Sequence, residues 1–411
     1  MLSYSAFTLN NGLQVLVHRD PNVQIAVVNL LYRVGARDED PAKTGFAHLF
    51  EHLMFGGSAN VPSYDEPLQQ AGGENNAFTS NDLTNYYLTV PAANLETGFW
   101  LESDRMLALS FDPRVLEVQR KVVVEEFKQS YLNKPYGDVW LKLRPLAYTV
   151  HPYQWPTIGK EPAHIEQATM DDVRDFFYSH YLPNNAILVV AGNVREEEVR
   201  YLAEKWFGPI PSGKVRSAVR RPEPPQNEKR TLKHQADVPA HALYKAYHMA
   251  GRLDSQYHAA DLASDMLSRG KSSRLYTALV KEKKIFTGLS AFITGSIDPG
   301  LLVFNGRTNG DITPEEAEKH LDEVVSRFLE DGPTDQELEK VRNQTETSFG
   351  FNYVEVMSRA FNLAYATLLG DPSLVNTELE TIRKVSAADI RTAARSIIRE
   401  ENASVLYYHR R

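Results

Sequence analysis

Alternating and periodic apolar positions divide the first half of the chain into strands and helices. The apolar runs predict strands at residues 13–18, 24–34 and 186–191, and helices at 92–109, 113–132 and 169–178. The helix that begins at 113 has two start signals. The side chain of Asp112 can cap the first turn, and Pro113 lacks a backbone N–H at a position where the helix does not use one. The pattern therefore predicts a chain that mixes helices with strands.

A helix start and a strand recur late in the chain with the same spacing. Thr169-Met170-Asp171-Asp172-Val173 matches Ser386-Ala387-Ala388-Asp389-Ile390, and Asn185-Ala186-Ile187-Leu188-Val189 matches Asn402-Ala403-Ser404-Val405-Leu406. Both pairs are 217 residues apart (386 − 169 and 402 − 185). A constant offset across a helix and a strand favours duplication of a domain. The proline-rich polar stretch between the copies predicts domains at 1–212 and 231–411 joined by a linker at 213–230.

Three side chains capable of binding or serving a metal fall on one stripe of a short helix within residues 43–57. His48, Glu51 and His52 are spaced i, i+3 and i+4, beside an apolar face and before the Gly56-Gly57 pair that ends the helix. Two imidazoles one turn apart can share a zinc ion, and the adjacent carboxylate can act as a base. The inverted His-x-x-Glu-His order is a recognised zinc-peptidase variant. The alternative is a structural helix that carries these residues by chance.

Catalytic zinc usually takes a third protein ligand. The helix at 113–132 offers two neighbouring carboxylates, Glu125 and Glu126. Apolar Val122 and Val123 lie under both stripes, so periodicity alone does not choose between them. The second half of the chain has no His-x-x-Glu-His, so it cannot repeat this site.

Composition narrows the functional classes further. The 411 residues are 42% hydrophobic and 24% charged with a net charge of −8, which gives no support for nucleic-acid binding, and the basic stretch 214–221 is assigned to the linker. The chain contains no cysteine, so any metal must use histidines and carboxylates. No apolar run is long enough to predict a membrane span, and no secretion signal is visible, so we expect a cytoplasmic protein.

Three segments together resemble the M16 family of zinc metallopeptidases, which includes pitrilysin, insulinase and the mitochondrial processing peptidase. They are His48–His52, the Arg120-Lys121-Val122-Val123-Val124-Glu125-Glu126 stretch, and Asn76-Ala77-Phe78-Thr79-Ser80. The resemblance implies an α+β fold of the M16 and LuxS-like metallohydrolase type, with two homologous domains, each a mainly antiparallel β-sheet with helices packed on one face. It implies that Glu126 is the third zinc ligand. It also implies that Asn76, Ala77, Phe78 and Thr79 form a substrate-binding edge beside the metal.

The function implied by this resemblance is a zinc-dependent endopeptidase with one Zn²⁺ per chain. His48, His52 and Glu126 would hold the metal, and Glu51 would act as the catalytic base. Large family members carry four such domains in one chain, so a chain with two is expected to enclose peptides between two subunits. The alternative is a non-catalytic structural or peptide-binding subunit of a larger M16-type complex.

Two departures from the family pattern bear on these expectations. The family commonly has a Glu seven residues before the distal ligand, where this chain has Gln119. The family also carries an Arg and, seven residues later, a Tyr in the opposing half, where this chain has Val280 and Thr287. We therefore expect a homodimer or, for full activity, a heterodimer with a homologous M16 subunit that supplies the Arg/Tyr pair.

Overall fold

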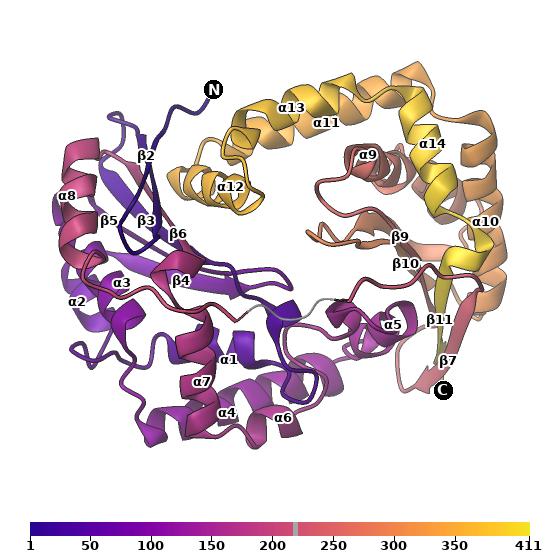
Figure 1. The fold of residues 1–411 in the computed structure, drawn as a ribbon. Helices are drawn as coiled ribbons and strands as arrows, with labels where there is room; N and C mark the ends of the chain where they lie inside the picture. The colour runs from indigo at the N-terminus through magenta and orange to yellow at the C-terminus, as the bar shows by residue number, and fades with distance from the viewer. Residues whose placement is uncertain (217–220) are drawn as a thin grey trace. The chain divides into compact units, whose positions relative to one another are not determined.

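The computed structural model describes residues 1–216 and 221–411, which form two compact units (Figure 1). Unit 1 comprises Met1–Lys128, Trp155–Arg220 and Gly350–Thr377, and unit 2 comprises Gln129–Gln154, Arg221–Phe349 and Glu378–Arg411. Each unit thus combines segments from both sides of the predicted linker 213–230. That linker, with its basic stretch, lies partly outside the described residues.

Unit 1 contains a six-stranded sheet with the order β1-β2-β6-β3-β5-β4. Its strands are β1 (Ser5–Thr8), β2 (Gln14–Arg19), β3 (Ile25–Tyr32), β4 (Glu74–Thr79), β5 (Thr84–Pro91) and β6 (Ala186–Gly192). Strands β2 and β6 pair in parallel, and the other neighbours pair antiparallel. Strand β4 has only β5 as a neighbour, so one side of its backbone lies at the edge of the sheet.

Unit 2 contains a five-stranded sheet with the order β7-β11-β8-β10-β9. Its strands are β7 (Arg230–Ala236), β8 (Ala242–His248), β9 (Phe286–Ile293), β10 (Leu301–Thr308) and β11 (Ala403–Arg410). Only β7 and β11 pair in parallel. The expected α+β class with two mainly antiparallel sheets is therefore confirmed.

Both units also contain helices. In unit 1 they are α1 (Phe46–Leu53), α2 (Asp65–Gln70), α3 (Leu95–Leu107), α4 (Pro113–Phe127), α6 (Ala163–Glu166), α7 (Met170–His180), α8 (Glu196–Trp206) and α12 (Val356–Leu368). In unit 2 they are α5 (Val139–Ala147), α9 (Tyr257–Ser268), α10 (Pro314–Asp331) and α14 (Ala387–Ile397). The chain passes between the units within α11 (Asp335–Asn352) and α13 (Leu374–Lys384). No helix in the described part of the chain is both long and apolar enough to cross a membrane.

The family resemblance implied helices on one face of each sheet, and the structure has helices on both faces. In unit 1, α3 contacts β3 and β5, while α12 packs through Ala360 and Leu363 on the face that contains Val27 and Val189. In unit 2, α5 covers one face and α9, α10 and α14 contribute to the core on the other. The apolar side chains of β3 are buried on both faces, so the strand needs this double cover.

The two face-covering helices α5 and α12 are equivalent members of the repeat. Helix α12 begins 217 residues after α5 (356 − 139), the offset that also separates β11 from β6 (403 − 186). Helix α5 precedes the predicted linker but belongs to unit 2, and α12 follows the linker but belongs to unit 1. The repeated halves therefore exchange one helix each, which is why the compact units are discontinuous along the chain.

The N-terminus of α1 is held by a buried carboxyl group. Glu39 accepts hydrogen bonds from the backbone N–H groups of Gly45 and Ala47, both at 2.9 Å, and from the indole of Trp155 at 3.1 Å. These bonds satisfy donors that a helix leaves free in its first turn. Gly45 has a φ of 89°, and a Cβ there would lie 2.7 Å from the carbonyl oxygen of Ile158, so this entry into α1 requires glycine.

Removing the titratable group of Glu39 is predicted to flatten the pH dependence of stability. Burial raises the pKa of Glu39 from 4.5 to about 8, despite the three N–H groups that favour its charged form. The folded protein then keeps this proton while the unfolded chain loses it, so stability falls as pH rises from about 4.5 to about 8. Between pH 5 and pH 8 the wild type should lose a few kcal/mol more unfolding free energy, to order of magnitude, than Glu39→Gln. Urea unfolding at both pH values measures the difference, and parallel losses would contradict it.

Candidate metal centre

Helix α1 presents its polar stripe because its apolar face is fixed by aromatic packing. The ring of Phe50 stacks on Phe176 and Tyr181, with centroids 4.9 and 5.1 Å apart. Leu49 and Phe50 are fully buried. The side chains of His48 and His52 are 13% and 25% exposed, so the polar stripe predicted on this helix borders solvent. The helix thus holds two imidazoles one turn apart on a rigid base.

Helix α4 brings the third candidate ligand to α1. Its start is capped as predicted, with the Asp112 carboxylate accepting the Arg114 N–H at 2.8 Å. Val123 and Phe127 bury the inner face of α4. On the outer side, the carboxylate of Glu125 pairs with Lys128 at 2.7 Å, while Glu126 faces the two histidines. The structure therefore separates the two carboxylates that sequence periodicity left equivalent.

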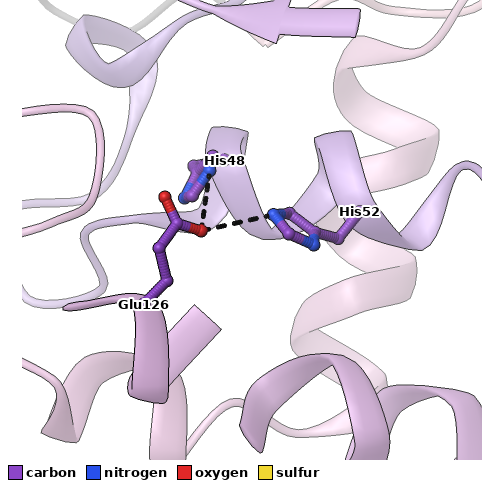
Figure 2. A group of neighbouring side chains, drawn as sticks. All are labelled: His48, His52 and Glu126. Carbon is purple, nitrogen blue, oxygen red and sulfur yellow. Dashed lines mark ion pairs between the residues drawn. The ribbon is translucent and has the colours of Figure 1, made fainter. Parts of the chain in front are cut away.

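His48, His52 and Glu126 converge on one point (Figure 2). One carboxylate oxygen of Glu126 lies 3.7 Å from Nε2 of His48 and 3.7 Å from Nε2 of His52. Among the described residues this is the group of three whose ligand atoms all lie within 4.8 Å of one another. Tetrahedral zinc, with bonds of roughly 2.0–2.1 Å, places its ligand atoms about 3.4 Å apart. The donor set and its spacing fit such an ion.

The charges at this centre hold two of the three groups, His48 and Glu126, in the protonation states that a metal requires. Burial lowers the pKa of His48, which favours the neutral imidazole that a metal requires. Interaction with the Glu126 carboxylate raises the pKa of His52, and the same interaction lowers the pKa of Glu126. Glu126 is thus held in its charged form, and a cation placed between the three groups would replace the proton that His52 otherwise gains.

Two supporting contacts were not predicted from the sequence. Gln119, which stands where the family commonly has a Glu, hydrogen-bonds to His52 and contributes to raising its pKa. The hydroxyl of Thr79 donates to Oε2 of Glu51 at 2.6 Å. By contrast, Nδ1 of His48 is buried and has no hydrogen-bond partner among the described residues. Contacts between separate elements leave no periodic signal in the sequence, so pattern reasoning could not find them.

The predicted substrate edge coincides with β4, the edge strand beside α1. Asn76 is exposed, and its side-chain oxygen accepts the N–H of Ala77 at 2.8 Å. The ring of Phe78 packs edge-on against Phe361 of α12, with centroids 5.2 Å apart. Thr79 contacts α1 on the opposite side of the strand, as the alternation of side chains along a strand requires. The four residues therefore share a strand, but their side chains do not share one surface.

The two positions aligned with the family's Arg/Tyr pair lie in unit 2. Val280 packs against the core of that unit, and the hydroxyl of Thr287 donates to the carbonyl of Arg307 at 3.3 Å. The neighbouring Arg274 is bound to Glu337 at 2.6 and 2.7 Å and to the carbonyl of Gly332. Val280 and Thr287 therefore offer no cationic group, and the guanidinium of Arg274 is engaged in a structural ion pair.

Comparisons with known proteins agree with this arrangement. The family model described as "Insulinase (Peptidase family M16)" matches residues 14–154, which contain His48, His52 and Glu126, and the model described as "Peptidase M16 inactive domain" matches 167–345. The chain is 30% identical over 353 residues to the zinc protease PqqE of Helicobacter pylori, an alignment that covers 84% of this chain and 79% of that protein.

Solved structures share the fold over the whole chain. A protease from Helicobacter pylori superposes with a TM-score of 0.93 at 26% identity, and the match covers 100% of both chains. The periplasmic protease PqqL from Escherichia coli superposes with a TM-score of 0.79 at 19% identity, but the match covers 99% of this chain and 47% of PqqL. With family models matching residues 14–154 and 167–345 and a relative at 30% identity, this chain belongs to the M16, or insulinase, family of peptidases.

Proposed function

We propose that this chain is a zinc-dependent endopeptidase that cleaves peptides or unfolded segments. The observation that carries the proposal is the convergence of His48, His52 and Glu126, with Glu51 on the same stripe of α1. Relatives named as zinc proteases support the choice of metal and of reaction class. A structural helix would not need two histidines and a charged carboxylate turned toward one another at the edge of solvent.

In this proposal Glu51 is the catalytic base. A bound zinc ion supplies Lewis acidity, which polarises the scissile carbonyl and makes water a nucleophile near neutral pH. The Glu51 carboxylate takes the proton from the attacking water and passes it to the departing amine, so the peptide bond breaks without a charged amide leaving group. Gln119 and Glu126, both on α4, hydrogen-bond to the ring of His52 and hold it in the orientation that binds the metal.

The open edge of β4 is the proposed binding site for the peptide backbone. An extended peptide can pair with this edge through main-chain hydrogen bonds, which makes binding tolerant of side-chain identity. The exposed Asn76 currently satisfies the N–H of Ala77 with its own side chain. A carbonyl of the substrate can accept the N–H of Ala77 in place of the Asn76 side chain. The Asn76 amide is then free to orient the scissile bond.

A second M16 subunit completes the proposed enzyme. The chain matches about half of the PqqL chain, 47%, so one copy supplies half of such a molecule. Amide hydrolysis benefits from donors aimed at the developing oxyanion. Val280 and Thr287 cannot supply them, and a homologous partner that carries the Arg/Tyr pair can. Peptide cleavage by the assembled complex distinguishes this role from a non-catalytic or peptide-binding subunit.

Replacing the proposed base should separate metal binding from chemistry. Glu51→Gln keeps the shape of the side chain but cannot accept the proton, so turnover of an unstructured peptide should fall by about 10²–10⁴-fold. Zinc affinity should stay within a few-fold of wild type because Glu51 is not a ligand. Peptide cleavage and zinc titration test both statements, with His48→Ala as the control that loses zinc as well. Near-normal hydrolysis by Glu51→Gln would overturn the assignment.

The adjacent carboxylates provide a matched pair for testing the third ligand. Glu126→Gln removes a ligand and should weaken zinc binding by more than about 100-fold, beyond the effect typical of an outer partner. Glu125→Gln removes only an exposed contact with Lys128 and should leave affinity unchanged. Competition with a graded chelator measures both constants. Equal losses, or a larger loss in Glu125→Gln, would move the ligand assignment.

The isolated chain is predicted to be much less active than a mixed complex. Combining it with a homologous subunit that carries the Arg/Tyr pair should raise kcat by about 10²-fold or more, the effect typical of oxyanion donors. Replacing that Arg and Tyr in the partner provides the control, because assembly should persist while the gain disappears. A homodimer that is already as active as the mixed complex would rule out the need for a different partner.

A further inference from the structure

One hydrogen bond joins the proposed catalytic base to the proposed substrate strand. Thr79 is the last residue of β4, and its hydroxyl donates to Oε2 of Glu51 on α1 at 2.6 Å. The carbonyl oxygen of Ala47 lies 3.5 Å from the same hydroxyl, at the outer limit of a hydrogen bond. A hydroxyl has a single proton to donate, so the shorter contact to the carboxylate takes it.

This bond restricts a side chain that α1 alone leaves mobile. Glu51 is half-buried on the solvent side of its helix and can populate several rotamers. With Oε2 held by Thr79, the orientation of the carboxylate is set, and Oε1 is the oxygen left to receive a proton. A proton-transfer group must stand within hydrogen-bond reach of its target, so loss of that orientation reduces the rate and leaves substrate affinity unchanged.

We propose that Thr79 is a positioning residue that orients Glu51 for proton transfer and thereby ties the base to the strand on which the peptide lies. The inference rests on the proposed function, in which the backbone of β4 binds the peptide, and adds to it a role for the side chain of Thr79. The backbone of Thr79 pairs with Thr84 of β5, so the hydroxyl is carried by the sheet and not by the metal-binding helix. Strand β4 therefore orients the carboxylate of Glu51, although Glu51 itself lies on α1.

Two substitutions at one position isolate the hydroxyl. Thr79→Val keeps the branched shape and the β4 backbone but removes the donor, whereas Thr79→Ser restores it. Thr89→Val makes the same change in β5, at a residue that pairs with Glu74 at the far end of β4, and serves as the control. All variants should be assayed in the active assembly, with kcat and KM for an unstructured peptide measured separately.

Thr79→Val should lower kcat by about 10–100-fold with KM within a factor of two, the loss typical of an outer hydrogen-bond partner. Thr79→Ser should recover most of that rate, and Thr89→Val should match wild type. Zinc affinity should be unchanged in all three, because no ligand is altered. A crystal structure of Thr79→Val should show the Glu51 carboxylate turned away from β4.

The possible outcomes separate this inference from the proposed function. If wild type cleaves peptide and Thr79→Val cleaves it equally well, the positioning role is wrong while the peptidase assignment stands. If Thr79→Val loses stability and zinc binding together and Thr79→Ser recovers both, the hydroxyl only joins α1 to β4, and the inference is also wrong. If the wild-type assembly binds zinc but cleaves nothing, the proposed function itself fails, whatever the crystal structure shows for Glu51.

Discussion

The carboxyl group of Glu39 holds the helix on which the proposed chemistry depends. It is buried, and it accepts two N–H groups from the start of α1 and one from Trp155. A buried polar group is costly unless it is hydrogen-bonded, so the three N–H donors stabilise the carboxyl group of Glu39 in this position. With the start of α1 fixed in this way and its apolar face stacked on α7, the two histidines have little freedom to move relative to Glu126.

Around this helix, two separate elements hold three side chains of the candidate site. Helix α4 presents Glu126 to both histidines and Gln119 to His52, while β4 presents Thr79 to Glu51. The proposed metal ligands and the proposed base thus have different supports, although His48, His52 and Glu51 share a stripe of α1. Such a division keeps metal affinity and proton transfer separable, because a change on β4 does not touch a ligand and a change on α4 does not touch the base.

Local spacing was enough to predict part of this site. The i, i+3, i+4 pattern placed His48, Glu51 and His52 on one helical stripe, whereas the edge at Asn76, Ala77, Phe78 and Thr79 came from the family resemblance. The choice between Glu125 and Glu126 came from the family resemblance, since valines lie under both stripes. The Thr79 contact was beyond sequence reasoning because it joins residues 28 positions apart on different elements. The exchange of α5 and α12 was also missed, since a repeat offset shows that two helices are equivalent and not which sheet each one covers.

The central claim is that His48, His52 and Glu126 together bind one zinc ion. Crystals grown with zinc and measured on both sides of its absorption edge test this directly. The account predicts a single strong anomalous peak about 2.0–2.2 Å from Nε2 of both histidines and from a carboxylate oxygen of Glu126. Absence of a peak at this position, or coordination through Glu51 or Glu125 in place of Glu126, would contradict it.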